Sequence, residues 1–274
     1  MNNTQNPFSL EGKVIIVTGG TGVLGESFVR SIVKWGGKVA ILGRKEKVAK
    51  ERAEILNANG GDAIGIAADV LDEDSLIRAK GIILEKFGRI DGLVNGAGGN
   101  MPGAVLEPNA DIFGLDIDAL KEVLDLNLFG SIKPTQVFGR EIAKTGNGVI
   151  VNISSMSAQR VITKVLGYSM AKTAVDCYTK WFAVELANRY GDKIRMNAIA
   201  PGFFLTEQNR TLLTNQDGSF KERGNLVITQ TPFKRFGTAE ELEGALIYLL
   251  SDASRFVTGS ILNVDGGFAA FGGV

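Results

Sequence analysis

Seven short apolar runs, rich in β-branched residues, alternate along the chain with longer amphipathic stretches. The runs cover residues 14–17, 39–42, 63–67, 93–95, 149–153, 194–200 and 261–264. They are apolar on both sides instead of alternating with polar residues, which is typical of strands buried inside a parallel sheet. We therefore predict an α/β fold, a doubly wound, Rossmann-type parallel sheet of about seven strands with helices on both faces.

The composition does not shift midway along the 274 residues, which predicts a single domain over 1–274. The polar stretch 1–10 is expected to be flexible. Two connections, 98–118 and 203–231, are longer than packing between helices and strands requires, and we expect 203–231 to form a substrate lid. Such sheets bind ligands beyond the carboxyl ends of their strands, so functional residues should follow strands.

Composition excludes several classes of function. Thirty basic residues balance thirty acidic ones, so no broad field favours nucleic acid or an anionic membrane. Neither a secretory signal nor a membrane-spanning run is apparent, and the expected location is the cytoplasm. Cys177 is the only cysteine and histidine is absent, which argues against a disulfide, a metal site and a Ser-His-Asp triad. Proton transfer must then use Tyr, Lys or a carboxylate.

A glycine-rich turn follows the first predicted strand. Gly20, Gly22 and Gly25 have the Gly-x-Gly-x-x-Gly spacing, with a helical stretch directly after them. Glycines let the backbone approach a pyrophosphate, whose charge is stabilised by the free N–H groups at the helix start. The alternative is an ordinary tight strand-to-helix turn. The context favours dinucleotide binding.

Positive charge follows the second strand, where an NAD enzyme would place a carboxylate on the ribose. Arg44 and Lys45 suit a 2′-phosphate there, which favours NADP(H) over NAD(H), although they could simply be a solvated helix start. Asp69 and Val70, after the third strand, could line an adenine pocket. The small residues of 95–98 could form a flat floor for the cofactor, and the alternative for both segments is a plain strand-ending turn.

A Tyr and a Lys four residues apart open the long helical stretch that follows the fifth strand. Tyr168 and Lys172 share a helix face, so the ammonium can lie near the phenol. Lowering a phenol pKa from about 10 to roughly 7 requires around 4 kcal/mol, which the ammonium and an oxidised nicotinamide could supply. By itself the pair could be one buried aromatic beside one solvated lysine.

Other residues support a catalytic interpretation of this pair. Ser155, at the end of the fifth strand, can donate a hydrogen bond to a substrate oxygen, with Ser154 as the rival candidate. Asn127 could hold a water that links Lys172 to solvent, or it could merely interrupt a helix. Together these residues predict an enzyme that moves a hydride between a nicotinamide and a carbonyl or alcohol carbon.

With these residues the chain resembles the short-chain dehydrogenase/reductase family over about residues 10–267. The matching features are the glycine turn, Asn95-Gly96-Ala97-Gly98, Asn127, Ser155, Tyr168 with Lys172, the run 197–202 with Thr206, and Val264-Asp265-Gly266-Gly267. One feature departs from the family: its turn usually carries the middle glycine at the position of Val23, whereas here it is Gly22.

The resemblance implies catalytic roles for four residues: Ser155 as hydrogen-bond donor, Tyr168 as acid and base, Lys172 as the group that lowers the phenol pKa and binds the ribose, and Asn127 as proton relay. The expected cofactor-binding residues are Gly19, Thr21, Gly22, Val23, Leu24, Arg44, Lys45, Asp69, Val70, Asn95, Gly96, Ala97, Tyr168, Lys172, Pro201, Gly202, Phe204 and Thr206. Family members are usually homotetramers or homodimers, for which the helices around 120–138 and 174–186 are suited.

Within the family, the segments 18–25, 95–100 and 200–210 look like the D-mannonate oxidoreductase branch, also described as D-fructuronate reductase. That likeness implies a sugar-acid substrate. Its expected contacts are Asn100, Gln159, Arg160, Lys164 and Arg210, each of which could instead be a solvated loop residue. The alternatives are a reductase for another polyol, gluconate-type acid or ketone, and a non-catalytic nucleotide-sensing protein.

Overall fold

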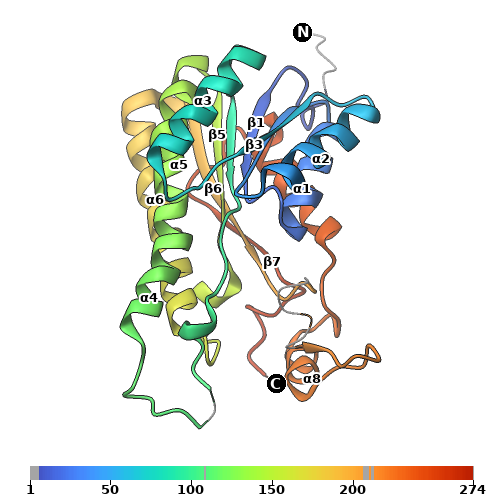
Figure 1. The fold of residues 1–274 in the computed structure, drawn as a ribbon, viewed down its shortest axis with the longest axis vertical. Helices are drawn as coiled ribbons and strands as arrows, with labels where there is room; N and C mark the ends of the chain where they lie inside the picture. The colour runs from blue at the N-terminus through green and yellow to red at the C-terminus, as the bar shows by residue number, and fades with distance from the viewer. Residues whose placement is uncertain (1–5, 108, 206–209, 211–212, 274) are drawn as a thin grey trace.

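The computed structural model describes residues 6–107, 109–205, 210 and 213–273, and Figure 1 shows its fold. Seven parallel strands form one sheet in the order β3-β2-β1-β4-β5-β6-β7. The strands are β1 (Val14–Thr18), β2 (Lys38–Gly43), β3 (Ala63–Ala67), β4 (Gly92–Asn95), β5 (Gly148–Ile153), β6 (Ile194–Pro201) and β7 (Ile261–Val264). The predicted fold class is confirmed, and each apolar run is a strand.

Helices cover both faces of the sheet (Figure 1). One layer holds α1 (Val23–Lys34), α2 (Glu46–Ala58) and α9 (Glu243–Leu250), and the other holds α3 (Glu73–Phe87), α5 (Gly130–Thr145) and α6 (Leu166–Tyr190). Two further helices are α4 (Ile117–Leu124) and α8 (Glu222–Gln230); the short turns are η1 (Pro102–Ala104), the π-helical η2 (Asp125–Phe129), η3 (Met156–Ala158), η4 (Gly191–Lys193), η5 (Ala239–Leu242) and η6 (Asp252–Ser254). Within the described residues, none of these helices has the length and apolarity needed to span a membrane.

Strand β1 explains why apolar residues are needed on both sides of the central strands. Ile15 belongs to the buried cluster that includes Phe28 of α1, whereas Ile16 belongs to the cluster that includes Phe138 of α5. Successive side chains of a strand point to opposite faces. A continuous apolar run therefore fills both helix–sheet interfaces, and burial of these side chains stabilises the three layers.

The order of the strands reverses between β1 and β4. These two strands are neighbours in the sheet although β2 and β3 separate them in the sequence. Thr18, the last residue of β1, is fully buried at this point. Its Oγ1 accepts hydrogen bonds from the N–H groups of Gly96 (3.1 Å) and Ala97 (3.2 Å) and donates one to Val94 O (3.4 Å). The loops that follow β1 and β4 are thereby joined at the point where such folds bind ligands.

The stretch 1–10, expected to be flexible, and the segment 203–231, expected to form a lid, have defined structure in part. In the stretch 1–10, residues 1–5 lie outside the described residues, but Leu10 is fully buried and its N–H donates to Trp35 O at 2.9 Å. The expected flexibility therefore does not extend to Leu10, because its side chain fills the core beside α1. Helix α8 lies within the predicted lid 203–231, of which 206–209, 211 and 212 are not described.

A substitution of Gly65, in β3, tests how tightly this strand packs against α2. A Cβ at this position would lie 2.2 Å from the carbonyl carbon and oxygen of Ala49, closer than real contacts allow. We expect Gly65→Ala to lower the free energy of unfolding by about 1–3 kcal/mol, because the helix must shift. Chemical denaturation measures this change. Gly81→Ala in α3 is the matched control: nothing lies within 4 Å of its Cβ position, and a gain of up to about 1 kcal/mol is expected. Equal effects would contradict the close packing.

Candidate active site

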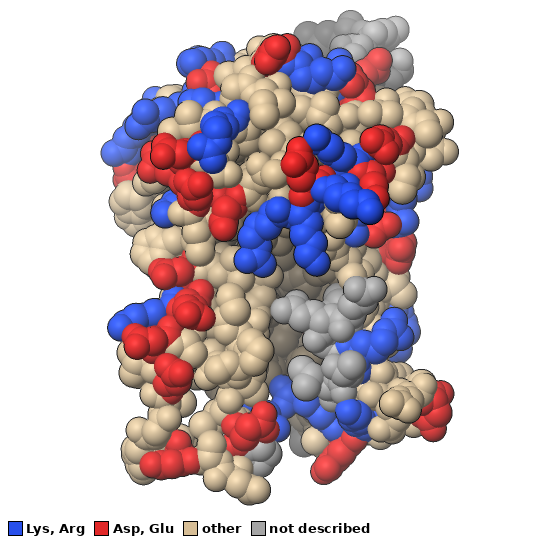
Figure 2. All heavy atoms as spheres, in the orientation of Figure 1, with Lys and Arg blue, Asp and Glu red and all other residues tan. Residues whose placement is uncertain are grey.

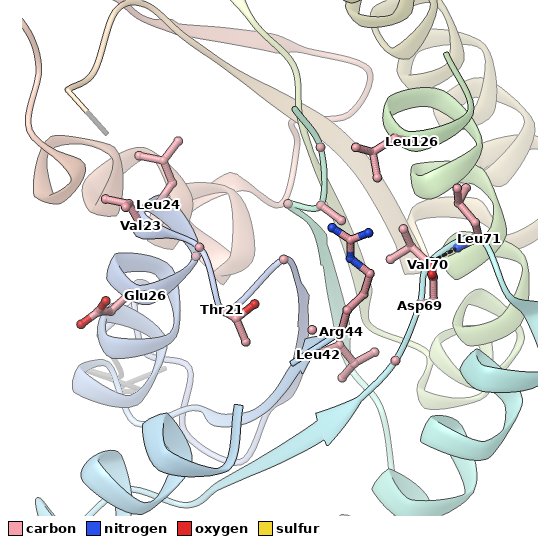
Figure 3. Close-up of a pocket in the computed structure, with 18 of the residues that line it drawn as sticks. Thr21, Val23, Leu24, Glu26, Leu42, Arg44, Asp69, Val70, Leu71 and Leu126 are labelled. Carbon is pink, nitrogen blue, oxygen red and sulfur yellow. Dashed lines mark hydrogen bonds between the residues drawn. The ribbon is translucent and has the colours of Figure 1, made fainter. Parts of the chain in front are cut away.

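A pocket of about 680 Å³ opens over the carboxyl ends of β1, β2, β3 and β4 (Figure 3). On the face shown in Figure 2 the molecule is hollowed, and basic side chains gather along the upper rim of the hollow. The described residues that line the pocket are Gly19, Thr21, Gly22, Val23, Leu24, Gly25, Glu26, Leu42, Gly43, Arg44, Arg52, Ala68, Asp69, Val70, Leu71, Gly96, Ala97, Gly98, Met101, Glu122, Asp125 and Leu126. Its position at the change in strand order is the one expected for a dinucleotide.

In the turn, Gly19 and Gly25 are required by crowding against backbone atoms, and Gly22 is not. Gly19 has φ +67°, and a Cβ there would lie 2.6 Å from Gly96 O. A Cβ on Gly25 would lie 2.2 Å from Gly19 O, so α1 and the turn touch backbone to backbone. Gly22, in contrast, would place a Cβ no closer than 3.4 Å to the chain. The space beside Gly22 therefore belongs to the pocket.

The start of α1 completes an anion-binding end of the pocket. Gly22 is the N-cap and supplies no side-chain hydrogen bond, so it leaves N–H groups of the first turn available for a ligand. These groups and the helix dipole favour negative charge. With the open side of Gly22, this donor set fits the pyrophosphate of a dinucleotide.

The other end of the pocket carries the residues expected around the adenosine. Arg44 extends into the pocket between Thr21 and Val70 (Figure 3). Asp69 Oδ1 accepts the N–H of Leu71 at 2.9 Å, which shapes the loop after β3. Lys45 is the N-cap residue of α2 and is exposed, and it is not among the described residues that line the pocket.

Helix α6 and the end of β5 bring the predicted catalytic residues together. The buried ammonium of Lys172 donates a hydrogen bond to Ile153 O at 2.8 Å and lies 5.5 Å from the centroid of the Tyr168 ring. Tyr168 is half-buried, and its hydroxyl forms a hydrogen bond with the side chain of Ser155. The hydroxyl groups of Tyr168 and Ser155 and the ammonium of Lys172 thus lie close together, next to the loop that follows β4.

The two serines after β5 have different partners. Ser154 is buried, and its hydroxyl donates a hydrogen bond to the Asp176 carboxylate, one turn beyond Lys172 on α6. Ser155 caps the short turn η3 by accepting the N–H of Ser157 at 3.1 Å and also bonds with Tyr168. Of the two candidates, Ser155 is therefore the one placed beside the phenol, while Ser154 joins β5 to α6.

Asn127 lies in the π-helical turn between α4 and α5 and is fully buried. Its Nδ2 donates to Gly99 O (2.7 Å) and Val123 O (2.8 Å), and its Oδ1 accepts the N–H of Gly99 (3.1 Å). A Cβ on Gly98 would lie 2.7 Å from Asn127 Oδ1 and 3.3 Å from Lys172 Nζ. Asn127 thus interrupts the α-helical pattern, and it also lies across Gly98 from the ammonium.

Burial shifts the pKa values of both groups that could move a proton. It lowers the pKa of Lys172 from 10.5 to about 8, although the Asp176 carboxylate opposes this effect. It raises the pKa of the Tyr168 phenol, against which the hydrogen bond with Ser155 acts. The chain alone therefore does not lower the pKa of the Tyr168 phenol. Removing the phenolate from water destabilises it by more than the hydrogen bond with Ser155 stabilises it.

The five residues expected to contact substrate differ in the hydrogen-bond partners that they have within the protein and in their exposure. Gln159 forms two side-chain hydrogen bonds with Asn263, both 2.8 Å, and Arg160 donates to Phe271 O, so both hold the C-terminal segment. Lys164 adopts φ +75°, and its carbonyl accepts the N–H of Leu106 at 2.9 Å. The buried Asn100 Oδ1 has no hydrogen-bond partner among the described residues, and Arg210 is exposed. Gln159 and Arg160 thus have partners within the protein for part of their polar groups, and their contact with substrate stays a prediction.

Several residues expected to contact the cofactor also have partners within the protein. Asn95 is buried and donates to Thr135 Oγ1 (3.0 Å) and Asn152 Oδ1 (2.8 Å), which joins β4 to α5 and β5. Phe204 is buried with its ring against Gly237. Pro201 ends β6, the Gly202 N–H donates to Val264 O at 2.9 Å, and Thr206 lies outside the described residues. The side chains of Asn95 and Phe204 thus contact groups that only the assembled fold brings to them.

The pocket also contains residues that we did not predict from the sequence. Arg52 comes from the middle of α2 and reaches the glycine turn, and Glu122 and Leu126 come from the α4–η2 region. These residues carry no local pattern, because helices distant in the sequence bring them to the pocket.

Comparison with known proteins agrees with this geometry. Residues 22–269 match the family model described as enoyl-(acyl carrier protein) reductase. The chain is 44% identical to the uncharacterized oxidoreductase UxuB of Bacillus subtilis (strain 168), over 97% of this chain and 98% of that protein. It is also 29% identical to the 7alpha-hydroxysteroid dehydrogenase of Escherichia coli (strain K12), over 97% and 98% of the two chains.

Two solved structures extend the comparison to bound cofactors. A protein from Haemophilus influenza, provisionally named a D-mannonate oxidoreductase and crystallised with bound NAD, has a TM-score of 0.90 and 39% identity, covering 97% of this chain and 98% of that chain. A gluconate 5-dehydrogenase from Burkholderia cenocepacia J2315, in complex with NADP and tartrate, has a TM-score of 0.85 and 30% identity, covering 98% and 100%.

The buried ammonium of Lys172 predicts a pH dependence of stability. Its pKa in the fold, about 8, lies below the ordinary value of 10.5, so between these values the unfolded chain holds the proton more tightly than the native chain. Stability contributed at this site therefore rises with pH through that window. Relative to Lys172→Met, we expect the free energy of unfolding of the wild type to gain up to about 3 kcal/mol from pH 7 to 10.5.

Denaturant titrations of both chains across this pH range measure the difference. Lys47→Met, which removes an exposed lysine from α2, is the matched control and should give a curve parallel to that of the wild type. If Lys172→Met also ran parallel to the wild type, Lys172 would not be held in a desolvated environment.

Proposed function

The chain belongs to the short-chain dehydrogenase/reductase family, and we propose that it interconverts a keto-hexuronate and a hexonate, most specifically D-fructuronate and D-mannonate. It is an NAD(P)-dependent oxidoreductase, as its relatives and their cofactors show. The observation that carries the proposal is the meeting of Tyr168, Ser155 and Lys172 beside the pocket. Similarity to the protein named a D-mannonate oxidoreductase supports the substrate.

The bound nicotinamide supplies or accepts the hydride. In the reducing direction the carbonyl carbon gains the hydride, and its oxygen must gain a proton. In the proposal the Tyr168 hydroxyl donates that proton and, in the oxidising direction, takes it back. Ser155 donates a hydrogen bond to the same substrate oxygen, which orients it and stabilises its developing charge. The raised pKa of the Tyr168 phenol suits the donor role, because the proton is retained until the substrate oxygen becomes basic.

Lys172 and Asn127 are proposed to restore the proton on Tyr168. A lysine pKa of about 8 allows the ammonium to exchange a proton near neutral pH. Asn127 lies across Gly98 from this ammonium and holds the Gly99 peptide on both sides, so it defines the path from Lys172 toward the β4 loop. Lys172 also keeps the end of β5 in place through its bond to Ile153 O.

Recognition of a sugar acid requires hydroxyl contacts and a cation. Asn100 supports the first, because its buried Oδ1 has no hydrogen-bond partner among the described residues and can accept from a sugar hydroxyl. Lys164 and Arg210 remain the proposed carboxylate contacts. The segment 203–231, which includes α8, is proposed as the lid over this substrate.

The proposed cofactor is NADP(H), with NAD(H) as the alternative. The carboxyl end of β2 carries Arg44 in the pocket, and a guanidinium at that place suits a 2′-phosphate. The relatives point both ways, since one is described with NAD and another with NADP.

We further propose a cytoplasmic homotetramer or homodimer. Helix α6 leaves Trp181 (62% exposed) and Val184 (58% exposed) on one outer face, which a second copy could cover. A single cysteine in the whole chain accords with a reducing compartment.

A substrate screen tests the proposed reaction. The purified protein is assayed with D-mannonate, D-fructuronate, gluconate, their keto forms and the matching neutral polyols, each with NAD(H) and NADP(H). We expect kcat/KM for the uronate pair to exceed that for neutral polyols by at least about 100-fold, because a charge-assisted bond to the carboxylate is lost in the polyols. Preference for gluconate would support the gluconate-type alternative, and equal rates for acids and polyols would end the sugar-acid proposal.

Tyr168→Phe tests the acid and base. Removing one oxygen should lower kcat by about 10³-fold or more, while the dissociation constant for the cofactor stays within about twofold. Stopped-flow turnover and fluorescence titration measure the two quantities. Tyr190→Phe, at the exposed end of the same helix, is the matched control and should keep full turnover. Unchanged turnover in Tyr168→Phe would remove this residue from the mechanism, whereas a wild type that binds the cofactor without any turnover would favour a nucleotide-sensing role.

A further inference from the structure

Arg52 makes contacts that the proposed reaction does not yet use. It comes from the middle of α2, and its side chain is 18% exposed. Its Nη1 donates to the carbonyl oxygens of Gly20 (2.6 Å) and Gly22 (2.8 Å), and its Nη2 donates to Glu26 Oε2 (2.8 Å). One guanidinium therefore holds two peptides of the glycine turn and the first turn of α1.

These two carbonyls determine where two N–H groups point. In a trans peptide the C=O and the N–H of the following residue point in opposite directions. Gly20 O facing Arg52 therefore turns the Thr21 N–H away from α2, and Gly22 O does the same for the Val23 N–H. Thr21 and Val23 both line the pocket, and Val23 is the first residue of α1. Both N–H groups belong to the end of the pocket that fits a pyrophosphate.

The two peptides differ in how firmly the rest of the chain holds them. Gly22 O also accepts the N–H of Glu26 at 2.9 Å, the first hydrogen bond of the α1 ladder. The Gly20 carbonyl does not belong to that ladder, and glycine can rotate its peptide at little steric cost. Arg52 Nη1 bonds both carbonyls while Nη2 reaches Glu26, an arrangement of two nitrogens in a fixed fork that the single ammonium nitrogen of a lysine does not reproduce.

We propose that Arg52 is a positioning residue for the phosphate-binding turn: it orients the Thr21 and Val23 N–H groups toward the pyrophosphate of the dinucleotide. This inference rests on the proposed NAD(P)-dependent function. Three of its five N–H donors bond the two carbonyls and Glu26, and in this proposal Arg52 acts through the turn and not as a ligand of the 2′-phosphate. The pyrophosphate is common to both cofactors, and Arg52 therefore serves NADH and NADPH equally.

Arg52→Gln tests the proposal through binding. Dissociation constants for NADH and NADPH are measured by fluorescence titration and by calorimetry. We expect both to rise by about tenfold and by the same factor, because a misoriented peptide loses its bond to the shared pyrophosphate. In steady-state assays KM for either cofactor should rise similarly, with kcat at saturation within twofold. Arg52→Lys, which keeps the charge, should resemble Arg52→Gln instead of the wild type.

Arg189→Gln is the matched control, since it removes an exposed arginine that pairs with Glu185 at the far end of α6. It should leave both dissociation constants unchanged. A loss confined to NADPH, rescue by Arg52→Lys, or wild-type affinity in both Arg52 variants would each overturn the proposal. If Arg52→Gln does not fold, Arg52→Lys decides by the same criteria. A wild-type chain that binds neither dinucleotide would overturn the proposed function and this inference with it.

Discussion

The buried ammonium of Lys172 is the interaction on which the candidate site depends. Its hydrogen bond to Ile153 O joins α6 to the end of β5, so that Tyr168, one turn earlier, lies beside Ser155. Asp176, one turn later, bonds with Ser154 and partly compensates the buried charge. Burying an ammonium is costly, and here the cost is reduced by a carbonyl and a carboxylate. Burial lowers the pKa of Lys172 to about 8, and in the proposed reaction this suits a group that exchanges a proton near neutral pH.

The pocket depends on a second constraint, the close approach of two loops at the change in strand order. Thr18 joins the turn after β1 to the loop after β4, and Gly19 and Gly25 allow backbone contacts that any Cβ would prevent. In the proposal Arg52, which lines the same pocket, orients the turn through the carbonyls that it bonds. The anion-binding end is therefore built from backbone groups, whose direction is set by neighbours in space.

Prediction from sequence succeeded where one local pattern had one physical meaning. The seven apolar runs became the seven strands, because only a doubly covered parallel sheet buries both sides of each run. The prediction was weaker for polar side chains in loops. Arg160 was expected at the substrate and also bonds Phe271 O, and Asn95 was expected at the cofactor and also joins β4 to β5, contacts that no local pattern predicted. The hydrogen-bond partners of a loop residue are distant in the sequence, so a local sequence pattern does not predict them.

The sequence by itself determined the layered α/β fold, the glycine turn and the chemical set of Tyr168, Lys172, Ser155 and Asn127, since periodicity and residue type are local properties. Only the tertiary structure decided that Ser155 and not Ser154 meets the phenol, that burial places the Lys172 pKa at about 8, and that Arg52 holds the turn. Hydrogen-bond partners and desolvation depend on which elements pack together. These are long-range consequences of the fold, and they exist only once the sheet and its two helix layers have assembled.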